Sequence, residues 1–260
     1  MNLLVARIGD GLAATPHLKV WLDALAAWPG ALVLAPGVGP FGAAAKGAAQ
    51  AMGLNAVVAQ RIALMAMDQY AVALAAVRPS PVIAETEEAL RAAIAARRTA
   101  VWAPAHIASA ATDIPATPEI SSDSLAAWLA GRLGAAHLLL VEDSDPPRPV
   151  STAWLARRAL VDARFPDFAA VAKCPIWIAG PVACLDAEGL FALGRLPGAR
   201  VTAMRKTSTK VLGLSLRAKR SNPFPASKLG NGSFAASLLA MKDVDRRRPG
   251  PQGAIFTIIS

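Results

Sequence analysis

The sequence is poor in the residues that build metal centres and disulfide frameworks. Its 260 residues include two cysteines, Cys174 and Cys184, and three histidines, His17, His106 and His137. None of them follows the spacing of a zinc or cysteine motif. We therefore expect no metal ligands among them and interpret all five as structural or surface residues.

Long apolar runs are also missing. A membrane-spanning helix needs at least about 18 apolar residues, and the longest candidate, residues 62–77, is interrupted by Asp68 and Gln69. The first residues do not follow the order of a signal peptide, because the apolar run 3–6 is short and Arg7 follows it. We expect a cytoplasmic protein with no membrane span.

Most of the chain has no excess of basic over acidic residues; the excess is concentrated in the last 60 residues. Residues 1–200 contain 16 basic and 16 acidic residues, whereas residues 201–260 contain 11 and 2, which accounts for the net charge of +9. The main part therefore offers no charge argument for nucleic-acid binding. Residues 205–260 are basic and rich in Ser, Asn, Pro and Gly, so we predict a disordered tail. A nucleic-acid or anionic-membrane tether is one interpretation of this tail, and a solvated appendage is the favoured one.

Aromatic residues are scarce, at 5%, and apolar residues make up 54%. With abundant alanine, this composition favours helices packed on a sheet over an aromatic-rich β-sandwich. Short apolar runs alternate with helix-favouring segments over residues 1–204, as in a mainly parallel sheet with helices on both sides. We predict an α/β domain over these residues, a three-layer αβα sandwich.

The expected elements follow from the positions of apolar runs, prolines and glycines. Thr15 and Asn55 are the expected N-caps of two helices, and Gly134 is expected to end a third. The expected strands are residues 2–8, 31–34, 81–84, 99–102, 137–141, 176–179 and 199–203. The expected helices are residues 15–27, 41–51, 55–77 (buried), 85–97, 125–130, 154–171 (with a turn) and 185–193, and residues 103–118 are expected to form a loop or a set of short turns.

Glycine-containing turns follow the first two expected strands. Gly9 and Gly11 follow residues 2–8, and Gly37 and Gly39 follow residues 31–34, ahead of an alanine-rich helix. A strand, a glycine turn and a helix N-terminus together direct unpaired backbone N–H groups at an anion. We therefore predict a phosphate site here, with an ordinary tight turn as the alternative.

Asp123 is the carboxylate that the sequence singles out. It lies between Ser122 and Ser124 at an expected helix start, where it could orient a bound group or, alternatively, Ser122 or Asp123 could be a plain N-cap. An acidic loop, residues 142–145, follows the strand 137–141. In open α/β sheets ligands bind at these carboxyl ends.

Taken in order, these segments resemble the amino acid kinase family, the group of aspartate, glutamate and uridylate kinases. Residues 5–11 (VARIGDG) resemble its first strand and Lys-x-Gly-Gly-Ser loop, and residues 34–41 (LAPGVGPF) resemble its Pro-Gly-Gly-Gly loop. Residues 122–127 (SDSLAA), followed by strand 138–141, resemble its catalytic-aspartate helix and nucleotide-side strand. Residues 64–70 and 121–130 are similar to a subgroup that phosphorylates an aminomethylfuran phosphate with ATP in methanopterin-type cofactor synthesis. The resemblance covers about residues 2–204.

The resemblance implies a small-molecule kinase that uses ATP and Mg²⁺. Arg7 stands where the family has its γ-phosphate-binding lysine, and Asp123 stands where an aspartate holds the catalytic lysines. The implied phosphate and nucleotide residues are Gly9, Gly11, Gly37, Gly39, Ser122, Ser144 and Asp145, and Asp68 and Gln69 would lie towards the acceptor. The implied partner is a small-molecule substrate, and a homo-oligomer is compatible with the family.

Four residues depart from the family pattern. Arg7 replaces the compact ammonium group of the family's lysine by a planar guanidinium group, and Val38 adds a β-branched side chain to a glycine loop. Asp10 puts a carboxylate where anions should bind, and a like-charge pair about 4 Å apart costs on the order of 4 kcal/mol at an effective dielectric constant near 20. Glu142 stands where the subgroup often has lysine.

These departures leave a second hypothesis, a non-catalytic member of the family that acts as a nucleotide-binding or partner subunit. A nucleic-acid-binding protein would rest on the tail alone and ranks last. A doubly wound oxidoreductase is set aside, because Gly9-x-Gly11 lacks the third glycine of the dinucleotide motif.

Overall fold

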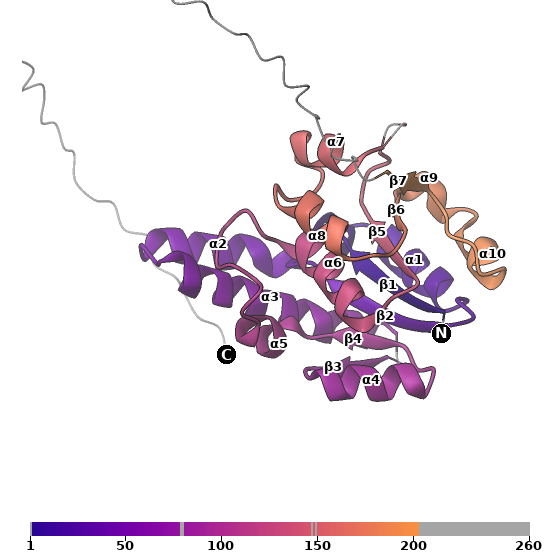
Figure 1. Ribbon diagram of the computed structural model, residues 1–260, viewed down its shortest axis with the longest axis horizontal. Helices are drawn as coiled ribbons and strands as arrows, with labels where there is room; N and C mark the ends of the chain where they lie inside the picture. The colour runs from indigo at the N-terminus through magenta and orange to yellow at the C-terminus, as the bar shows by residue number, and fades with distance from the viewer. Residues whose placement is uncertain (1, 79–80, 147, 149, 203–260) are drawn as a thin grey trace, which may run out of the picture. The chain divides into compact units, whose positions relative to one another are not determined.

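The computed structural model describes residues 2–78, 81–146, 148 and 150–202. Within these residues, seven strands form one sheet in the order β3-β4-β2-β1-β5-β6-β7 (Figure 1). All neighbours pair in parallel except β6 and β7, which are antiparallel. The strands are β1 (Leu3–Ile8), β2 (Ala31–Pro36), β3 (Val82–Ala84), β4 (Ala100–Trp102), β5 (His137–Val141), β6 (Ile176–Ala179) and β7 (Ala199–Val201).

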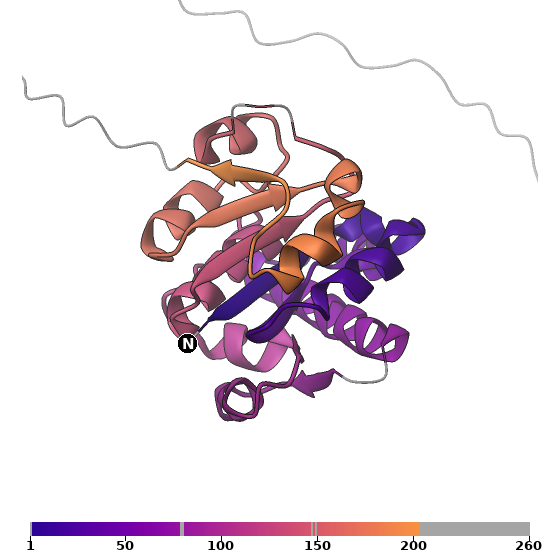
Figure 2. The ribbon, with the colours of Figure 1, turned by 90° about the vertical axis from the view of Figure 1, so that its right-hand side faces the viewer.

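Helices cover both faces of the sheet, so the predicted three-layer αβα sandwich is confirmed (Figure 2). One face carries α4 (Glu87–Ala95), α6 (Ser122–Leu133) and α8 (Phe165–Val171). The other carries α1 (His17–Leu25), α9 (Pro181–Cys184) and α10 (Ala187–Ala192). The predicted tail, residues 205–260, lies outside the described residues.

The alternation of side chains along β1 places one charge inside the protein. All six residues of β1 are buried, as expected for a parallel strand covered on both faces. Leu3 and Val5 belong to the core under α6, whereas Leu4 and Ile8 belong to the core under α1. By the same alternation, Arg7 points to the side of α6, where it is 5% exposed.

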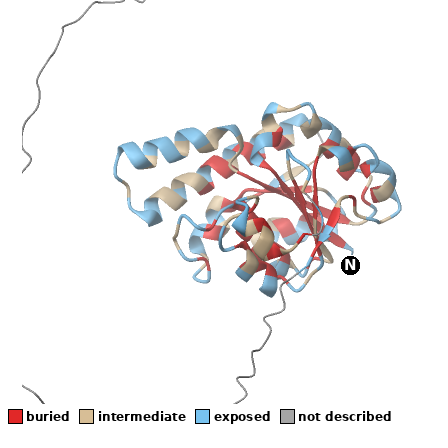
Figure 3. Cartoon of the chain, turned by 90° about the horizontal axis from the view of Figure 1, so that it is seen from above, coloured by how far each residue is buried: buried red, intermediate tan, exposed pale blue. Residues whose placement is uncertain are grey.

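The helix predicted over residues 55–77 is α3 (Ala56–Val77), and the side chain of Asn55 caps it by accepting from the amide of Val58 (3.0 Å). The expectation that the whole helix is buried is wrong. Its buried residues begin at Leu64, and Val57 is 64% exposed. The preceding helix, α2 (Gly42–Ala51), has no buried residue and is mostly pale blue in Figure 3, where the pair of helices extends beyond the sheet.

Two local expectations are corrected. The loop predicted over residues 103–118 contains α5 (Pro104–Ala110), which starts with a proline whose fixed φ suits the first helical turn. Thr15 is not the N-cap of α1: its hydroxyl donates to the carbonyl of Leu12 (3.0 Å) and closes a 3₁₀ helix, η1 (Asp10–Ala14). η1 was not predicted. A second 3₁₀ turn, η2 (Gly39–Phe41), precedes α2.

The helices between β5 and β7 were predicted in part. The helix and turn predicted over residues 154–171 correspond to α7 (Thr152–Arg157), a break and α8. The helix predicted over residues 185–193 corresponds to α10, whereas α9 lies before this range and was not predicted. Within the described parts of the chain, no helix combines the length and hydrophobicity needed to cross a membrane.

Candidate functional site

Arg7 is the centre of a buried group of polar side chains at the carboxyl end of β1. Its Nη1 donates to both carboxylate oxygens of Glu142, at 2.9 and 2.8 Å. Its Nε and Nη2 donate to the hydroxyl of Ser122, at 3.1 and 2.9 Å. The Nε atom also lies 3.1 Å from Oδ1 of Asp123. The predicted residues Arg7, Ser122 and Asp123 are therefore brought together, with Glu142 as a fourth member.

The sheet topology explains why these residues meet. β1 and β5 are parallel neighbours with Ile8 opposite Val141, so the residue after β5 lies beside the end of β1. Backbone hydrogen bonds continue beyond the strands, from the amide of Gly9 to Val141 and from that of Glu142 to Ala179, both 2.8 Å. The first turn of α6 lies on the same side and supplies the other two side chains.

Burial shapes the charges of this group. Burial raises the pKa of Asp123 to about 6 and that of Glu142 to about 7, although the positive charge of Arg7 acts in the opposite direction on both. For Arg7 burial lowers the pKa, but the carboxylates of Asp123, Glu142 and Asp10 outweigh it and raise the pKa. Arg7 is therefore a permanent cation whose charge is shared among several acids.

Asp162, which the sequence did not single out, holds the start of α6. Its carboxylate accepts from the backbone amides of Ser121 (3.0 Å) and Ser124 (2.9 Å) and from both serine hydroxyls. Its own amide donates to Oδ2 of Asp123 (3.0 Å). Ser121 is the N-cap residue and forms no side-chain cap, so the alternative that Ser122 or Asp123 caps this helix is wrong. Asp162 and the start of α6 are almost 40 residues apart, so no local sequence motif could have predicted their contact.

The glycine loops enclose carboxylates of the chain itself. The amide of Gly39 donates to Oδ1 of Asp10 (3.1 Å), and a Cβ atom built on Gly37 would lie 1.8 Å from the same oxygen. A Cβ atom on Gly11 would lie 1.8 Å from Oδ2 of Asp143. Two of the four predicted phosphate-loop glycines, Gly11 and Gly37, therefore leave room for Asp143 and Asp10, and Gly39 contributes its amide to Asp10.

The remaining glycine constraints come from the protein scaffold. A Cβ atom on Gly9 would lie 2.7 Å from the carbonyl oxygen of Val141. Gly39 has a φ of +52° and would place a Cβ atom 2.6 Å from Cγ of Tyr70, whose ring packs beneath the loop. Both positions therefore exclude a side chain for local packing reasons.

A cavity of about 220 Å³ opens beside Arg7. It is lined by Arg7, Asp10, Gly11, Glu142, Asp143, Ser144, Pro146, Ala159, Leu160 and Ile178. Of the predicted site residues, Arg7, Gly11 and Ser144 thus face one space. Glu142 faces it as well, which gives this cavity one cation and three carboxylates.

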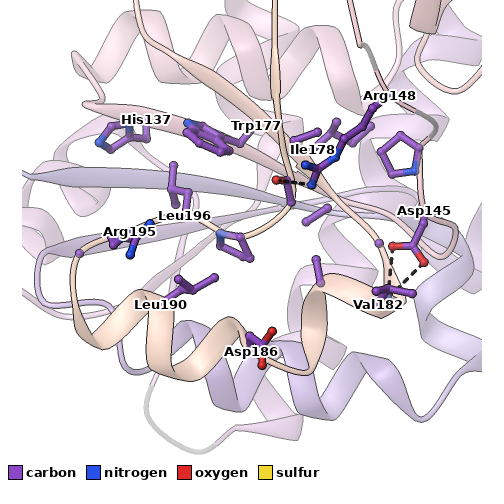
Figure 4. A pocket seen from close by; sticks show the side chains of 18 residues that line it. His137, Asp145, Arg148, Trp177, Ile178, Val182, Asp186, Leu190, Arg195 and Leu196 are labelled. Atoms are coloured by element: carbon purple, nitrogen blue, oxygen red, sulfur yellow. Dashed lines mark hydrogen bonds between the residues drawn. The ribbon is translucent and has the colours of Figure 1, made fainter.

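Other predicted residues serve elsewhere. The carboxylate of Asp145 accepts from the amide of Val182 (3.2 Å to each oxygen) at the start of α9. It borders a second cavity of about 720 Å³ beside α9 and α10, where Trp177 and Leu190 contribute apolar surface (Figure 4). Asp68 accepts from the amide of Ala105 (3.0 Å) and so supports the start of α5; burial raises its pKa.

Gln69, the other residue expected near the acceptor, is exposed on α3 and does not line the cavity beside Arg7. Across the described parts of the chain, no group of three or more His, Cys, Asp or Glu side chains is placed to hold a metal ion.

Comparison with known proteins supports the fold and leaves the chemistry open. No protein-family model and no curated protein matches the sequence. Among solved structures, uridylate kinase from Archaeoglobus fulgidus matches with a TM-score of 0.57 and 14% identity, over 78% of this chain and 100% of that one. UMP kinase from Bacillus anthracis (TM-score 0.53, 12% identity) covers 78% of this chain and 96% of its own.

An isopentenyl phosphate kinase matches equally well, with a TM-score of 0.53 and 12% identity over 76% of this chain and 100% of that one. These kinases are members of the amino acid kinase family. At such low identity the likeness establishes a shared fold, which is the fold that the sequence predicted.

Proposed function

We propose that the protein is a small-molecule kinase that takes the phosphoryl group from ATP. The observation that carries this proposal is the pair formed by Arg7 and Asp123, 3.1 Å apart, at the carboxyl end of β1 between the two glycine loops. The proteins with the same fold include uridylate and isopentenyl phosphate kinases, whose names place phosphorylated small molecules among their substrates.

Each residue near the cavity has a role in this proposal. Phosphoryl transfer depends on positioning and on neutralising the charge of the transferred group. Arg7 is the cation for that charge, and Asp123 and Ser122 hold its guanidinium in place. Gly9, Gly11, Gly37 and Gly39 form the proposed phosphate loops. The amides of Gly9 and Gly37 already donate to the carbonyl oxygens of Val141 (2.8 Å) and Ile8 (3.0 Å), so the proposed phosphate donors are the amide of Gly11 and, once Asp10 is displaced, that of Gly39. Ser144 and Asp145 lie on the proposed nucleotide side.

Mg²⁺ would enter as the complex with ATP. It binds oxygen ligands, retains several waters and commonly relies on substrate phosphates. Since the described residues offer no cluster that could hold it alone, the protein fits Mg²⁺ only in this substrate-borne form. When bound, it would neutralise part of the phosphate charge.

The proposed acceptor is a phosphorylated aminomethylfuran. The support for it is the similarity of residues 64–70 and 121–130 to the kinase subgroup with that substrate. Asp68 and Gln69 lie in the first of these segments, on α3, and are the residues proposed to face the acceptor.

One observation favours the second candidate function, a subunit that binds nucleotide or a partner without turnover. Arg7 already carries the carboxylates of Glu142 and Asp123, and Asp10 occupies the glycine loop where phosphate would bind. Restoring the family residues by Arg7→Lys, Asp10→Gly and Val38→Gly should create or raise activity if the departures alone suppress it.

Calorimetry of MgATP binding to the full chain tests both candidates, together with transfer of labelled γ-phosphate to the aminomethylfuran phosphate. Binding with transfer supports the kinase. Binding without transfer, in a chain that gains transfer in the triple variant, supports the second candidate. A protein that neither binds MgATP nor transfers phosphate contradicts the kinase and the nucleotide-binding form of the second candidate.

A further inference from the structure

The hydrogen-bond capacity of Arg7 is almost fully used by the protein. A guanidinium has five N–H donors. Glu142 receives two from Nη1, and Ser122 receives one from Nε and one from Nη2. Within the described residues, one N–H group of Nη2 has no partner and could bind a ligand. A phosphate needs more than one such donor to be held firmly.

Glu142 is the partner of Arg7 that can leave most easily. Ser122 and Asp123 belong to the first turn of α6, and Asp123 is tied to the amide of Asp162 (3.0 Å). Apart from its bonds to Arg7, Glu142 forms one hydrogen bond within the described residues, from its backbone amide to the carbonyl oxygen of Ala179, and the next three residues are exposed. Its side chain borders the cavity of about 220 Å³, so a rotation about its side-chain bonds can release Arg7 without moving the sheet.

We propose that Glu142 determines which anions the site accepts, because a ligand phosphate must displace its carboxylate from Nη1 of Arg7. This inference rests on the proposed function, since it assigns phosphate to the cavity beside Arg7. It makes Glu142 a specificity-determining residue: weak or singly charged anions do not replace it, whereas a polyphosphate with several charges can.

The charges around Glu142 determine how its competition varies with pH. It faces Arg7 from β1, Asp123 from α6 and Asp10 from η1, with Asp143 next to it in the chain. Burial raises the pKa of Glu142 to about 7, so above neutral pH its charged form binds Arg7 and competes with phosphate. As the pH falls below 7, Glu142 takes up a proton and the competition weakens.

The test is calorimetry of tripolyphosphate binding, without metal, to the full-length wild type and to Glu142→Gln at pH 6, 7 and 8. Glu188→Gln, the same change at an exposed position on α10, is the matched control. At pH 8 we expect Glu142→Gln to bind about tenfold more tightly, because a neutral amide competes for Nη1 of Arg7 less strongly than a carboxylate does. At pH 6 the two proteins should bind alike, and Glu188→Gln should follow the wild type throughout.

Equal affinities of wild type and Glu142→Gln at pH 8 overturn the inference, and so does a lack of tripolyphosphate binding to Glu142→Gln. If that variant does not fold, Glu142→Met, which keeps the length and removes the charge, must show the same gain. The proposed function is judged separately by phosphate transfer. Tighter tripolyphosphate binding without transfer keeps the role of Glu142 and refutes the kinase.

Discussion

Asp123 and Asp162 are joined by a hydrogen bond from the backbone amide of Asp162 to the carboxylate of Asp123, 3.0 Å long. The side chain of Asp162 in turn accepts the first amides of α6. One residue from the segment between α7 and α8 therefore fixes both the start of α6 and the carboxylate that faces Arg7. Loss of Asp162 should disturb stability and site geometry together.

We predict that Asp162→Ala lowers the free energy of unfolding by about 2 kcal/mol, the upper range for loss of a helix cap. Urea unfolding monitored by circular dichroism measures it. Asp167→Ala, which removes a surface ion pair with Arg164, is the control and should cost less than about 1 kcal/mol. A similar loss for both variants would show that Asp162 is not a cap.

Arg7→Met should destabilise the protein strongly, by about 3–5 kcal/mol at pH 8, because it leaves the buried carboxylates of Asp123 and Glu142 without their cation. The double variant Arg7→Met/Glu142→Gln should regain part of that loss, since one of the stranded charges is gone. Urea unfolding of the two single variants and the double variant gives the coupling energy. Additive effects would contradict the ion pair.

Stability should increase as the pH is lowered from 8 to 5. The folded-state pKa values of Asp123 and Glu142, about 6 and about 7, lie above their ordinary values of 3.8 and 4.5. The folded protein therefore binds more protons than the unfolded chain in this window, and the stabilisation is lost as the pH rises through 6 and 7.

Below about pH 4.5 the trend should reverse, because Asp23 and Glu87, whose pKa values are lowered by hydrogen bonds and ion pairs with basic side chains, lose stabilising charge. Urea unfolding across pH 3–8 measures both limbs. Glu142→Gln should flatten the limb between pH 6 and 8, and an unchanged slope there would refute the assignment.

Gly39→Ala should cost at least about 2 kcal/mol, because a side chain there combines a left-handed φ with a clash against the ring of Tyr70. Gly134→Ala separates the two causes: it has a φ of +64° but nothing within 4 Å of its Cβ position, so it carries the backbone cost alone. Gly47→Ala, in α2 with open space around it, should stabilise the protein slightly. Equal losses of unfolding free energy at Gly39 and Gly134 would show that the ring of Tyr70 moves aside without cost.

The sheet could be predicted because its signals are local. The run of residues 137–141 coincides with β5 and that of residues 176–179 with β6, since buried parallel strands are continuous apolar segments. Pairings between distant side chains carry no such signal. The caps that Asp145 and Asp162 provide for helices 37 and 38 residues away could not be read from spacing.

The sequence singled out Arg7, Ser122 and Asp123, which the fold brings together, but it did not show which groups fill the glycine loops. Glycine loops indicate unpaired N–H groups with room for an anion. Such a space can be filled equally well by a phosphate or by a carboxylate of the same chain. Asp10 was recognised as an obstacle, and the structure places it against Gly37 and Gly39. That Glu142 binds Arg7 follows from the parallel pairing of β1 and β5, which only the fold reveals.

The bond between Arg7 and Glu142 also affects how ligands can be detected. In a protein whose buried cation has no counter-ion until a ligand binds, the free form is less stable than the complex. Here Glu142 of the same chain already serves as the counter-ion of Arg7. A bound phosphate then exchanges one partner of Arg7 for another, and its measured affinity already includes the release of Glu142. Because ligand-induced stabilisation grows with the ratio of concentration to Kd, thermal-shift screens at micromolar ligand will miss binders that calorimetry at millimolar concentration detects.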